Sequence, residues 1–138
     1  MFCRVLLCAV AIVFTLSCTD LRADDENPIV TLVKTKVKDK TKPFSMSVAF
    51  KVKAGQEKAF AEAFAPCAAA TRKESGCLAY SLNHDIDDPT IFVVFEKFKN
   101  VAAIEQHAKS KHVEELLKKI GPMLDGDPSA KVYTPVAD

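Results

Sequence analysis

Titratable side chains follow apolar runs in the second half of this 138-residue chain. Glu96 stands inside an apolar stretch that ends at Phe98, and two histidines, His107 and His112, come after it. An imidazole titrates near neutral pH and can take a proton from a substrate, and a nearby carboxylate can orient that imidazole or polarise the substrate. These residues predict an apolar pocket with a few proton-handling groups, suited to a small, flat, apolar substrate.

His107 is the first candidate for a catalytic base, and Glu96 is the candidate for its helper. Each residue also has a purely structural alternative. His107 could bond a backbone carbonyl and hold a helix against a sheet. Glu96 could be a solvated carboxylate paired with a lysine. The sequence leaves both alternatives open.

The candidate substrate-binding residues are polar or aromatic side chains of the same region: Asn83, Tyr80, Phe50, Phe92 and His112. On one regular strand Tyr80 and Asn83 point to opposite faces, so both can reach one pocket only if a bulge intervenes. The spacing of His107 and His112 is poor for sharing one helix face, and the chain has no Cys-x-x-Cys pair. We therefore predict no metal site.

Length and composition limit the domain organisation and the partners. The chain has 138 residues, of which 49% are hydrophobic, enough for one packed core. The formal net charge is +1, and lysines alternate with acidic residues instead of forming one basic block. Nucleic acid is therefore a poor candidate partner, and a single domain is expected.

Residues 1–23 have the form of an export signal, with Arg4 before an apolar run, Val5–Leu16, that is too short to span a bilayer. Cleavage after Ala23 is the favoured processing, and lipidation at Cys18 is the second alternative. An uncleaved anchor is the third. All three predict a periplasmic or extracellular protein with no membrane contact beyond this signal or a lipid anchor.

Two cysteines, Cys67 and Cys77, remain after the signal region. The first falls in a predicted helix and the second begins a predicted strand, which makes the geometry of a bridge doubtful. Two separate buried thiols are favoured over a disulfide.

Residues 24–43 are rich in Lys, Thr and Asp with scattered Val and Leu, and we predict a linker or an added edge strand there. The regular domain, residues 44–138, follows. Alternation, helical spacing and capping residues predict strand 44–53, helix 56–75, strands 78–82 and 90–98, helices 100–108 and 111–120, and a closing strand at 130–133. Pro66 predicts a kink or break near Ala65.

This order of elements predicts an α+β fold, a ferredoxin-like split βαβ sandwich with both helical segments on one face of an antiparallel sheet. The other face of the sheet is then uncovered. We expect Phe50, Phe92 and Val94 to expose apolar surface there. A symmetric homodimer that packs sheet against sheet would cover it.

Four ordered segments resemble the antibiotic-biosynthesis monooxygenase domain, including the small bacterial quinol monooxygenases: residues 52–56, 74–80, 95–98 and 103–107 followed by 111–112. The likeness covers roughly residues 45–136. It implies a dimeric α+β barrel and oxygenation of phenolic or quinol substrates by molecular oxygen, with no cofactor. His107 and His112 match the two histidines of the family pattern.

The resulting prediction is an exported, cofactor-independent monooxygenase that oxidises a small quinol-like or phenolic compound with oxygen. Superfamily membership does not decide the reaction. A non-catalytic dimeric module that binds an apolar small molecule, and an isomerase that uses the same histidine, stay open as alternatives.

Overall fold

The computed structural model describes residues 26–137, so the predicted signal peptide, with Ala23 and Cys18, lies outside the described residues. Within the described part, no helix has both the length and the apolar composition needed to cross a membrane. The described residues form one four-stranded sheet with helices packed on it.

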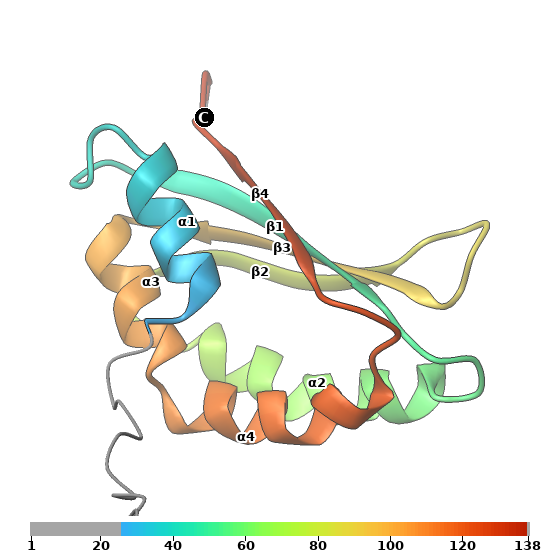
Figure 1. Ribbon diagram of the computed structural model, residues 1–138. Helices are drawn as coiled ribbons and strands as arrows, with labels where there is room; N and C mark the ends of the chain where they lie inside the picture. Colours follow the sequence, from blue (N-terminus) through green and yellow to red (C-terminus); the bar gives the residue numbers. More distant parts are fainter. Residues whose placement is uncertain (1–25, 138) are drawn as a thin grey trace, which may run out of the picture.

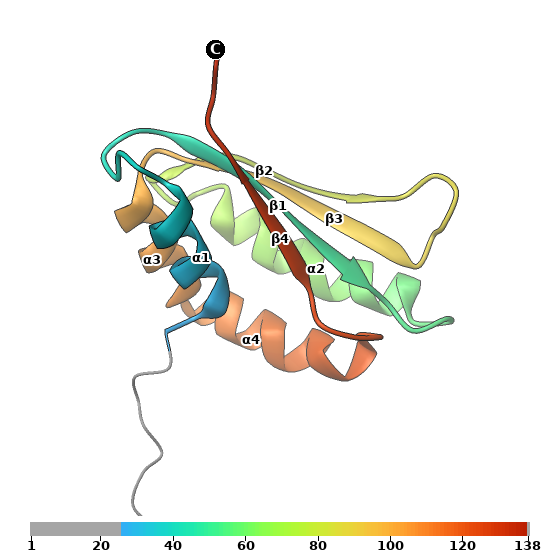
Figure 2. The same cartoon turned by 45° about the horizontal axis from the view of Figure 1, so that its top comes forward.

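The sheet has the strand order β2-β3-β1-β4, and all its pairs are antiparallel. The strands are β1 (Phe44–Lys51), β2 (Cys77–His84), β3 (Ile91–Phe98) and β4 (Ser129–Tyr133). The helices are α1 (Pro28–Lys36), α2 (Glu57–Thr71), α3 (Val101–Ala108) and α4 (Lys111–Ile120), with a short 3₁₀ helix at Gly121–Met123. Figures 1 and 2 show all four α-helices on the same side of the sheet. The predicted α+β ferredoxin-like split βαβ fold is confirmed.

The register of the sheet decides which strand residues face the helices. Phe50 of β1 is paired with Phe92 of β3, and Val48 with Val94. Phe50, Phe92 and Val94 are 6%, 5% and 1% exposed, so their predicted position on the uncovered face is wrong. Alternation along a strand groups residues by face, but it does not say which face the helices cover.

The uncovered face carries a different set of apolar side chains. Leu78 and Phe95 are each 52% exposed, and Tyr133 is 46% exposed. Regular alternation would place Leu78 on the same face as Tyr80, but the pairing of β2 with β3 shifts register between Cys77 and Ala79. This irregularity turns Leu78 outward while Tyr80 stays buried.

Residues 28–36 form α1, a helix where a linker or edge strand was predicted. The Asn27 side chain accepts a hydrogen bond from the Ile29 amide at 2.9 Å, and Pro28 occupies the start of the helix, where a missing N–H costs little. Val30 and Val33 lie one turn apart and are buried. Their β-branched side chains favoured a strand in isolation, but packing against the core decides for the helix.

Of the kink or break predicted near Ala65, the break is absent, because α2 runs continuously through Pro66. Pro66 is exposed, so solvent can satisfy the carbonyl that its ring leaves without a partner. Cys67 and Cys77 both carry free thiols.

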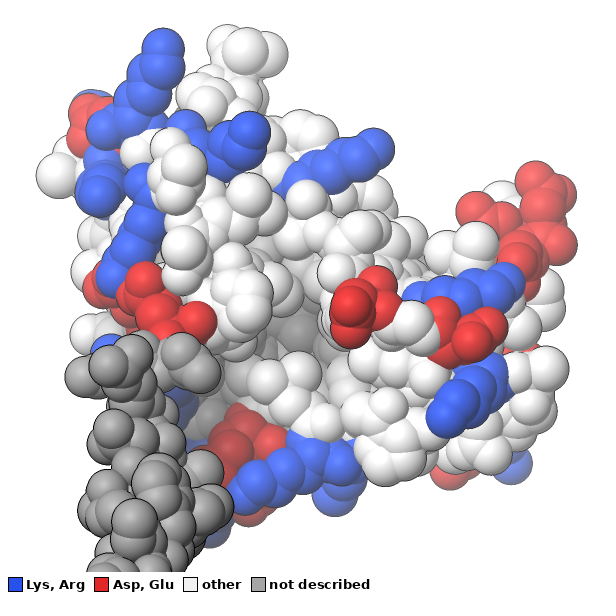
Figure 3. All heavy atoms as spheres, in the orientation of Figure 1, with Lys and Arg blue, Asp and Glu red and all other residues white. Residues whose placement is uncertain are grey.

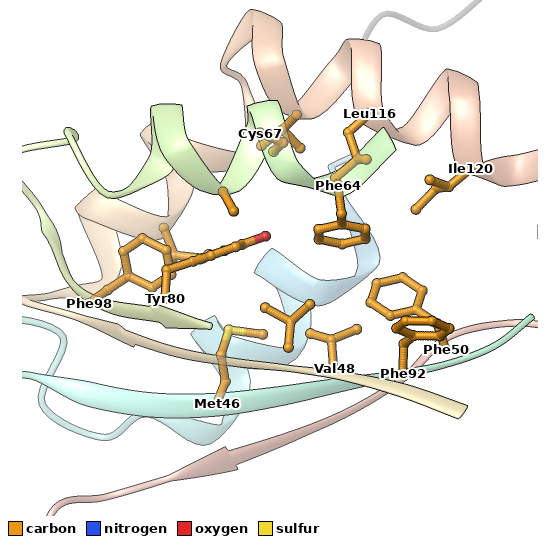
Figure 4. Close-up of a cluster of buried hydrophobic side chains, with 14 of the residues drawn as sticks. Met46, Val48, Phe50, Phe64, Cys67, Tyr80, Phe92, Phe98, Leu116 and Ile120 are labelled. Carbon is orange, nitrogen blue, oxygen red and sulfur yellow. The ribbon is translucent and has the colours of Figure 1, made fainter. Parts of the chain in front are cut away.

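An aromatic cluster fills one end of the layer between the sheet and the helices. The ring of Phe60 lies 4.7 Å from that of Phe92, 5.1 Å from that of Phe64 and 5.6 Å from that of Phe50, measured between centroids. Figure 4 shows Phe50 and Phe92 rising from the strands toward Phe64 on α2. These rings anchor α2 to the sheet.

Candidate active site

A pocket lies in the same layer, beside the aromatic cluster. Its wall is mostly aliphatic and aromatic, with side chains from all four helices and from β1, β2 and β3. Its interior offers about 70 Å³ of free volume, and the hollow up to its open mouth measures about 530 Å³. Figure 3 shows this hollow between α1 and α4, beside β4, surrounded mainly by uncharged residues. A small organic molecule can therefore enter an apolar environment here.

Glu96 brings a carboxyl group into the pocket wall from the central strand β3. It is paired with Met46 of β1 and with Tyr80 of β2, and it is only 8% exposed. Its Oε2 atom is buried and has no hydrogen-bond partner among the described residues. Burial raises the pKa of Glu96 to about 8, and repulsion from Glu74 adds to the shift. At neutral pH this carboxyl group is therefore mostly protonated and can donate a hydrogen bond.

His107 reaches the same pocket from α3 and is 7% exposed. Its Nδ1 atom lies 3.1 Å from both carboxylate oxygens of Glu74, so Nδ1–H donates to that carboxylate. Burial lowers the pKa of His107, although Glu74 acts in the opposite direction through its charge and its hydrogen bond. The imidazole is thus neutral at pH 7, with its lone pair on Nε2.

Glu74 is the residue of the site that the sequence analysis did not single out. It lies in the turn between α2 and β2, where Gly76 comes very close to α3. A Cβ atom on Gly76 would be only 2.4 Å from the Cβ of Ala103. Glycine thus lets this turn approach α3 and places Glu74 beside His107. Glu74 falls in a segment that resembles the family pattern, but nothing in the sequence shows that its carboxylate meets a histidine.

His112 contacts Glu74 and does not line the pocket. Its Nε2 atom lies 2.7 Å from Glu74 Oε1, and its ring centroid is 6.0 Å from that of His107. The argument from spacing treated the two histidines as members of one helix. In the structure α3 ends at Ala108 and α4 starts at Lys111, and the change of direction brings both rings to one carboxylate.

The other predicted substrate contacts divide between the pocket and the rest of the molecule. Tyr80 and Phe50 line the pocket, whereas Phe92 does not line it and packs against Phe60. Asn83 is exposed, and its amide donates to Ser81, so it lies outside the pocket, as the parity with Tyr80 requires.

The Tyr80 hydroxyl provides a further polar group of the pocket. Figure 4 shows the ring reaching in from β2, with the hydroxyl oxygen directed toward the side where Val48 and Phe64 lie. Burial raises the pKa of Tyr80, so the phenol stays protonated. Among the described residues the hydroxyl has no hydrogen-bond partner, which leaves it available to a bound molecule.

The helix α1 supplies pocket wall that sequence reasoning missed. Asn27, Ile29 and Val30 line the pocket next to α3 and α4. The prediction of a linker or edge strand at residues 24–43 hid this contribution. The hydrophobic positions Val30 and Val33, spaced by three residues behind a capping Asn27, were the available signal.

The distance between the two buried titratable groups indicates what the site can do. His107 Nε2 lies 3.9 Å from Glu96 Oε2, too far for a direct hydrogen bond. A hydroxyl oxygen of a substrate can lie at about 2.8 Å from both atoms, where it donates to the imidazole and accepts from the carboxylic acid. This arrangement can remove a proton from a phenol and stabilise the resulting oxyanion.

A family model described as "Antibiotic biosynthesis monooxygenase" matches residues 43–119. The chain belongs to this family. The match includes Glu74, Glu96, His107 and His112, whereas α1 and β4 lie outside it. The walls that α1 adds to the pocket therefore lie outside the segment that the family model matches.

Solved structures share the fold of this chain. A structure described as antibiotic biosynthesis monooxygenase is 24% identical, with a TM-score of 0.65, and the match covers 68% of this chain and 99% of that chain. Rv0793 from Mycobacterium tuberculosis is 23% identical, with a TM-score of 0.65, over 70% of this chain and 97% of that one. At these identities the likeness shows the fold.

One curated relative is the uncharacterized protein sll1783 from Synechocystis. It is 30% identical over 63 residues, which cover 46% of this chain and 43% of the relative. The match thus spans less than half the length of that relative and adds no activity to the family assignment.

Proposed function

We propose that the protein is an exported monooxygenase that uses molecular oxygen to oxidise a small phenolic or quinol-like compound and needs no metal, flavin or haem for this reaction. Family membership and the apolar pocket support the reaction class. The pair formed by His107 and Glu96 is the observation that carries the proposal.

His107 acts as the base in this proposal. The Glu74 carboxylate accepts from Nδ1–H and so fixes the tautomer, which leaves the lone pair of Nε2 for the proton of the substrate. Glu74 thus takes the orienting role that the sequence analysis gave to Glu96. The protonated Glu96 instead donates to the oxygen of the substrate and stabilises the anion.

The substrate itself supplies the electrons. A deprotonated, electron-rich phenol can pass an electron to oxygen. The resulting phenoxyl radical and superoxide then combine at a ring carbon. One oxygen atom enters the product as a carbonyl, and the second leaves as water with two hydrogen atoms of the substrate. The protein must bind the phenol, take its proton and exclude bulk water, and the apolar pocket meets these needs.

A homodimer completes the proposed molecule. Leu78, Phe95 and Tyr133 expose apolar surface on the face of the sheet opposite the helices. A second copy packed sheet against sheet would bury these side chains and close the family's α+β barrel. Sedimentation should give twice the mass of the processed chain, and Phe95→Glu should shift it toward the monomer.

Export is proposed from residues 1–23 alone, which lie outside the described residues. Mass spectrometry of the protein from a periplasmic or extracellular fraction distinguishes cleavage after Ala23 from lipidation at Cys18. Recovery of the unprocessed chain in the cytoplasm alone would contradict export.

Oxygen uptake with a panel of phenols and reduced quinones, in the presence of a chelator, tests the reaction. The native protein should exceed the uncatalysed rate, and His107→Ala should lower the excess by about 10²–10⁴-fold. His84→Ala is the matched control, because His84 is exposed and, among residues 26–137, its ring hydrogen-bonds only the neighbouring Asp85 carbonyl.

An equal rate in the native and His107→Ala proteins would contradict the role of His107. Saturable binding of a phenol without any excess oxygen uptake would identify a binding module instead. Conversion of a substrate without oxygen consumption would identify an isomerase.

A further inference from the structure

We propose that Glu74, His107 and His112 form a binding site for a divalent transition-metal ion of the zinc type. His107 Nδ1, His112 Nε2 and a carboxylate oxygen of Glu74 lie within 4.8 Å of one another. Two imidazole nitrogens and one carboxylate oxygen are ligands that Zn²⁺ binds readily, with the remaining positions open to water or another ligand.

The donor atoms are close to the spacing of a metal centre. Bonds of 2.0–2.1 Å in a tetrahedral site place donor atoms about 3.3–3.4 Å apart. Glu74 Oε1 lies 3.1 Å from His107 Nδ1 and 2.7 Å from His112 Nε2. Small side-chain rotations that open these two distances by roughly 0.2–0.7 Å would create room for the ion.

Three different segments hold the ligands. Glu74 belongs to the turn that Gly76 brings against α3, His107 to the last turn of α3, and His112 to the first turn of α4. Because each backbone is fixed by the fold, the chain presents the three donors together without the ion. The side chains of Glu74 and His112 are 22% and 26% exposed, so an ion can reach them from solvent.

Glu96 provides an independent observation in favour of the site. A metal-bound histidine usually donates its other ring N–H to a carboxylate. With an ion on Nδ1 of His107, the proton must sit on Nε2, which faces the buried and unpaired Oε2 of Glu96 at 3.9 Å. The ion would thereby place an N–H donor beside that orphaned oxygen, and a side-chain shift of about 1 Å would close the hydrogen bond of a carboxylate–histidine–metal arrangement.

The site has a consequence for the proposed oxygenation. The base in that proposal is the lone pair of His107 Nε2, and an ion on Nδ1 replaces this lone pair by an N–H group. Zinc should therefore inhibit the reaction, with half of the effect at the ion concentration that fills half of the sites. This consequence rests on the proposed function, whereas the binding of the ion does not.

Calorimetric titration of the tag-free protein with ZnCl₂ tests the site, and the visible absorption of bound Co²⁺ reports its coordination. We expect one ion per chain. Glu74→Gln and His112→Asn should each weaken Zn²⁺ binding by tenfold or more, and Glu96→Leu should weaken it by about 10–100-fold. His84→Asn should leave the affinity unchanged, because His84 lies outside the cluster.

Circular dichroism verifies that each variant is folded, and His112→Asn changes a partly exposed side chain that is not part of the core. The proposal is overturned if Zn²⁺ binds equally well to the native and His112→Asn proteins, or if micromolar Zn²⁺ gives no binding. Neither result involves oxygen uptake, so each is distinguishable from a failure of the oxygenase proposal.

Discussion

The layer between the sheet and the helices has two unlike ends. At one end Phe60, Phe64 and Phe92 pack ring against ring, and Phe60 is completely buried. At the other end Glu96 and His107 are almost as deeply buried, but the carboxyl group has an unpaired oxygen. Both ends are built on β3, but α2 supplies Phe60 and Phe64 to the first end and α3 supplies His107 to the second.

The contrast shows where the stability of the fold comes from and where it is reduced. Buried aromatic rings stabilise the fold through apolar burial and ring contacts. A buried carboxyl group without a partner destabilises it. Buried unpaired groups of this kind are expected at functional sites, where packing elsewhere in the fold offsets their unfavourable free energy. Four substitutions test this comparison.

Phe60→Ala should have the largest effect on stability. Phe60 is 0% exposed and contacts three other rings, so its loss leaves a cavity in the aromatic end. The free energy of unfolding, measured by urea denaturation, should fall by about 3–5 kcal/mol. Ile86→Ala, at a position 94% exposed, should change it by less than about 0.5 kcal/mol. Equal changes in the free energy of unfolding for the two variants would contradict the idea that the aromatic end stabilises the fold.

Glu96→Gln should make the protein more stable than the native protein, and this difference should grow as the pH rises. Glu96 ionises near pH 4.5 in the unfolded chain and, because burial raises its pKa, near pH 8 in the folded chain. Between these values the folded state binds more protons, so the stability of the native protein falls with increasing pH. Relative to the Gln variant, the native protein should lose about 3–4 kcal/mol of stability between pH 5 and pH 8.

The residues that face Glu96 affect the free energy of unfolding of each protein, but they affect it in both. Glu74 from the α2–β2 turn, His107 from α3 and Tyr80 from β2 are present in both proteins, so the difference between the two urea titrations isolates Glu96. Glu62→Gln, an exposed carboxylate on α2, serves as the control and should show no such trend. A pH-independent difference for Glu96→Gln would show that this carboxyl group ionises normally.

Gly76→Ala tests the link between the α2–β2 turn and α3. The added Cβ would meet Ala103 at 2.4 Å, so the turn must move away from the helix. Such overpacking should lower the free energy of unfolding by about 1–3 kcal/mol and withdraw Glu74 from His107. Gly121→Ala is the matched control, because nothing lies within 4 Å of its new Cβ. Similar unfolding curves for the two variants would refute the close approach.

Tyr80→Phe should have the smallest effect. The hydroxyl lines the pocket and has no partner among the described residues, so its removal should change stability very little. If it bonds a substrate, KM should rise by a few-fold, which corresponds to about 0.5–1.5 kcal/mol. A fall in the free energy of unfolding of more than about 1.5 kcal/mol would show that the hydroxyl supports the core.

Local patterns predicted most of the elements. Alternation in residues 44–53 and three- and four-residue spacing in residues 111–120 are properties of neighbouring residues, and they identified β1 and α4. The helix predicted to start at residue 100 is α3, and the Asn100 side chain caps it by accepting from the Ala103 amide at 2.9 Å. The strand order followed from the ferredoxin-like sequence of elements, because few topologies connect them.

The candidate site was predictable only in part. Glu96, His107, Tyr80 and Phe50 were named from the sequence, and all four line the pocket. Asn83 was also named, although its parity with Tyr80 already placed it on the other face of the sheet.

Tertiary structure alone decided the remaining features. The spacing of Val30 and Val33 behind a capping asparagine is a local signal for a helix, but it does not show that the helix packs on this core. Alternation along a strand likewise does not show which face the helices cover. Glu74 meets His107 across 33 positions of sequence, and His112 joins them only because the chain turns between two helices. Sequence periodicity reports on neighbours along the chain, whereas a shared carboxylate depends on where distant backbones meet in space.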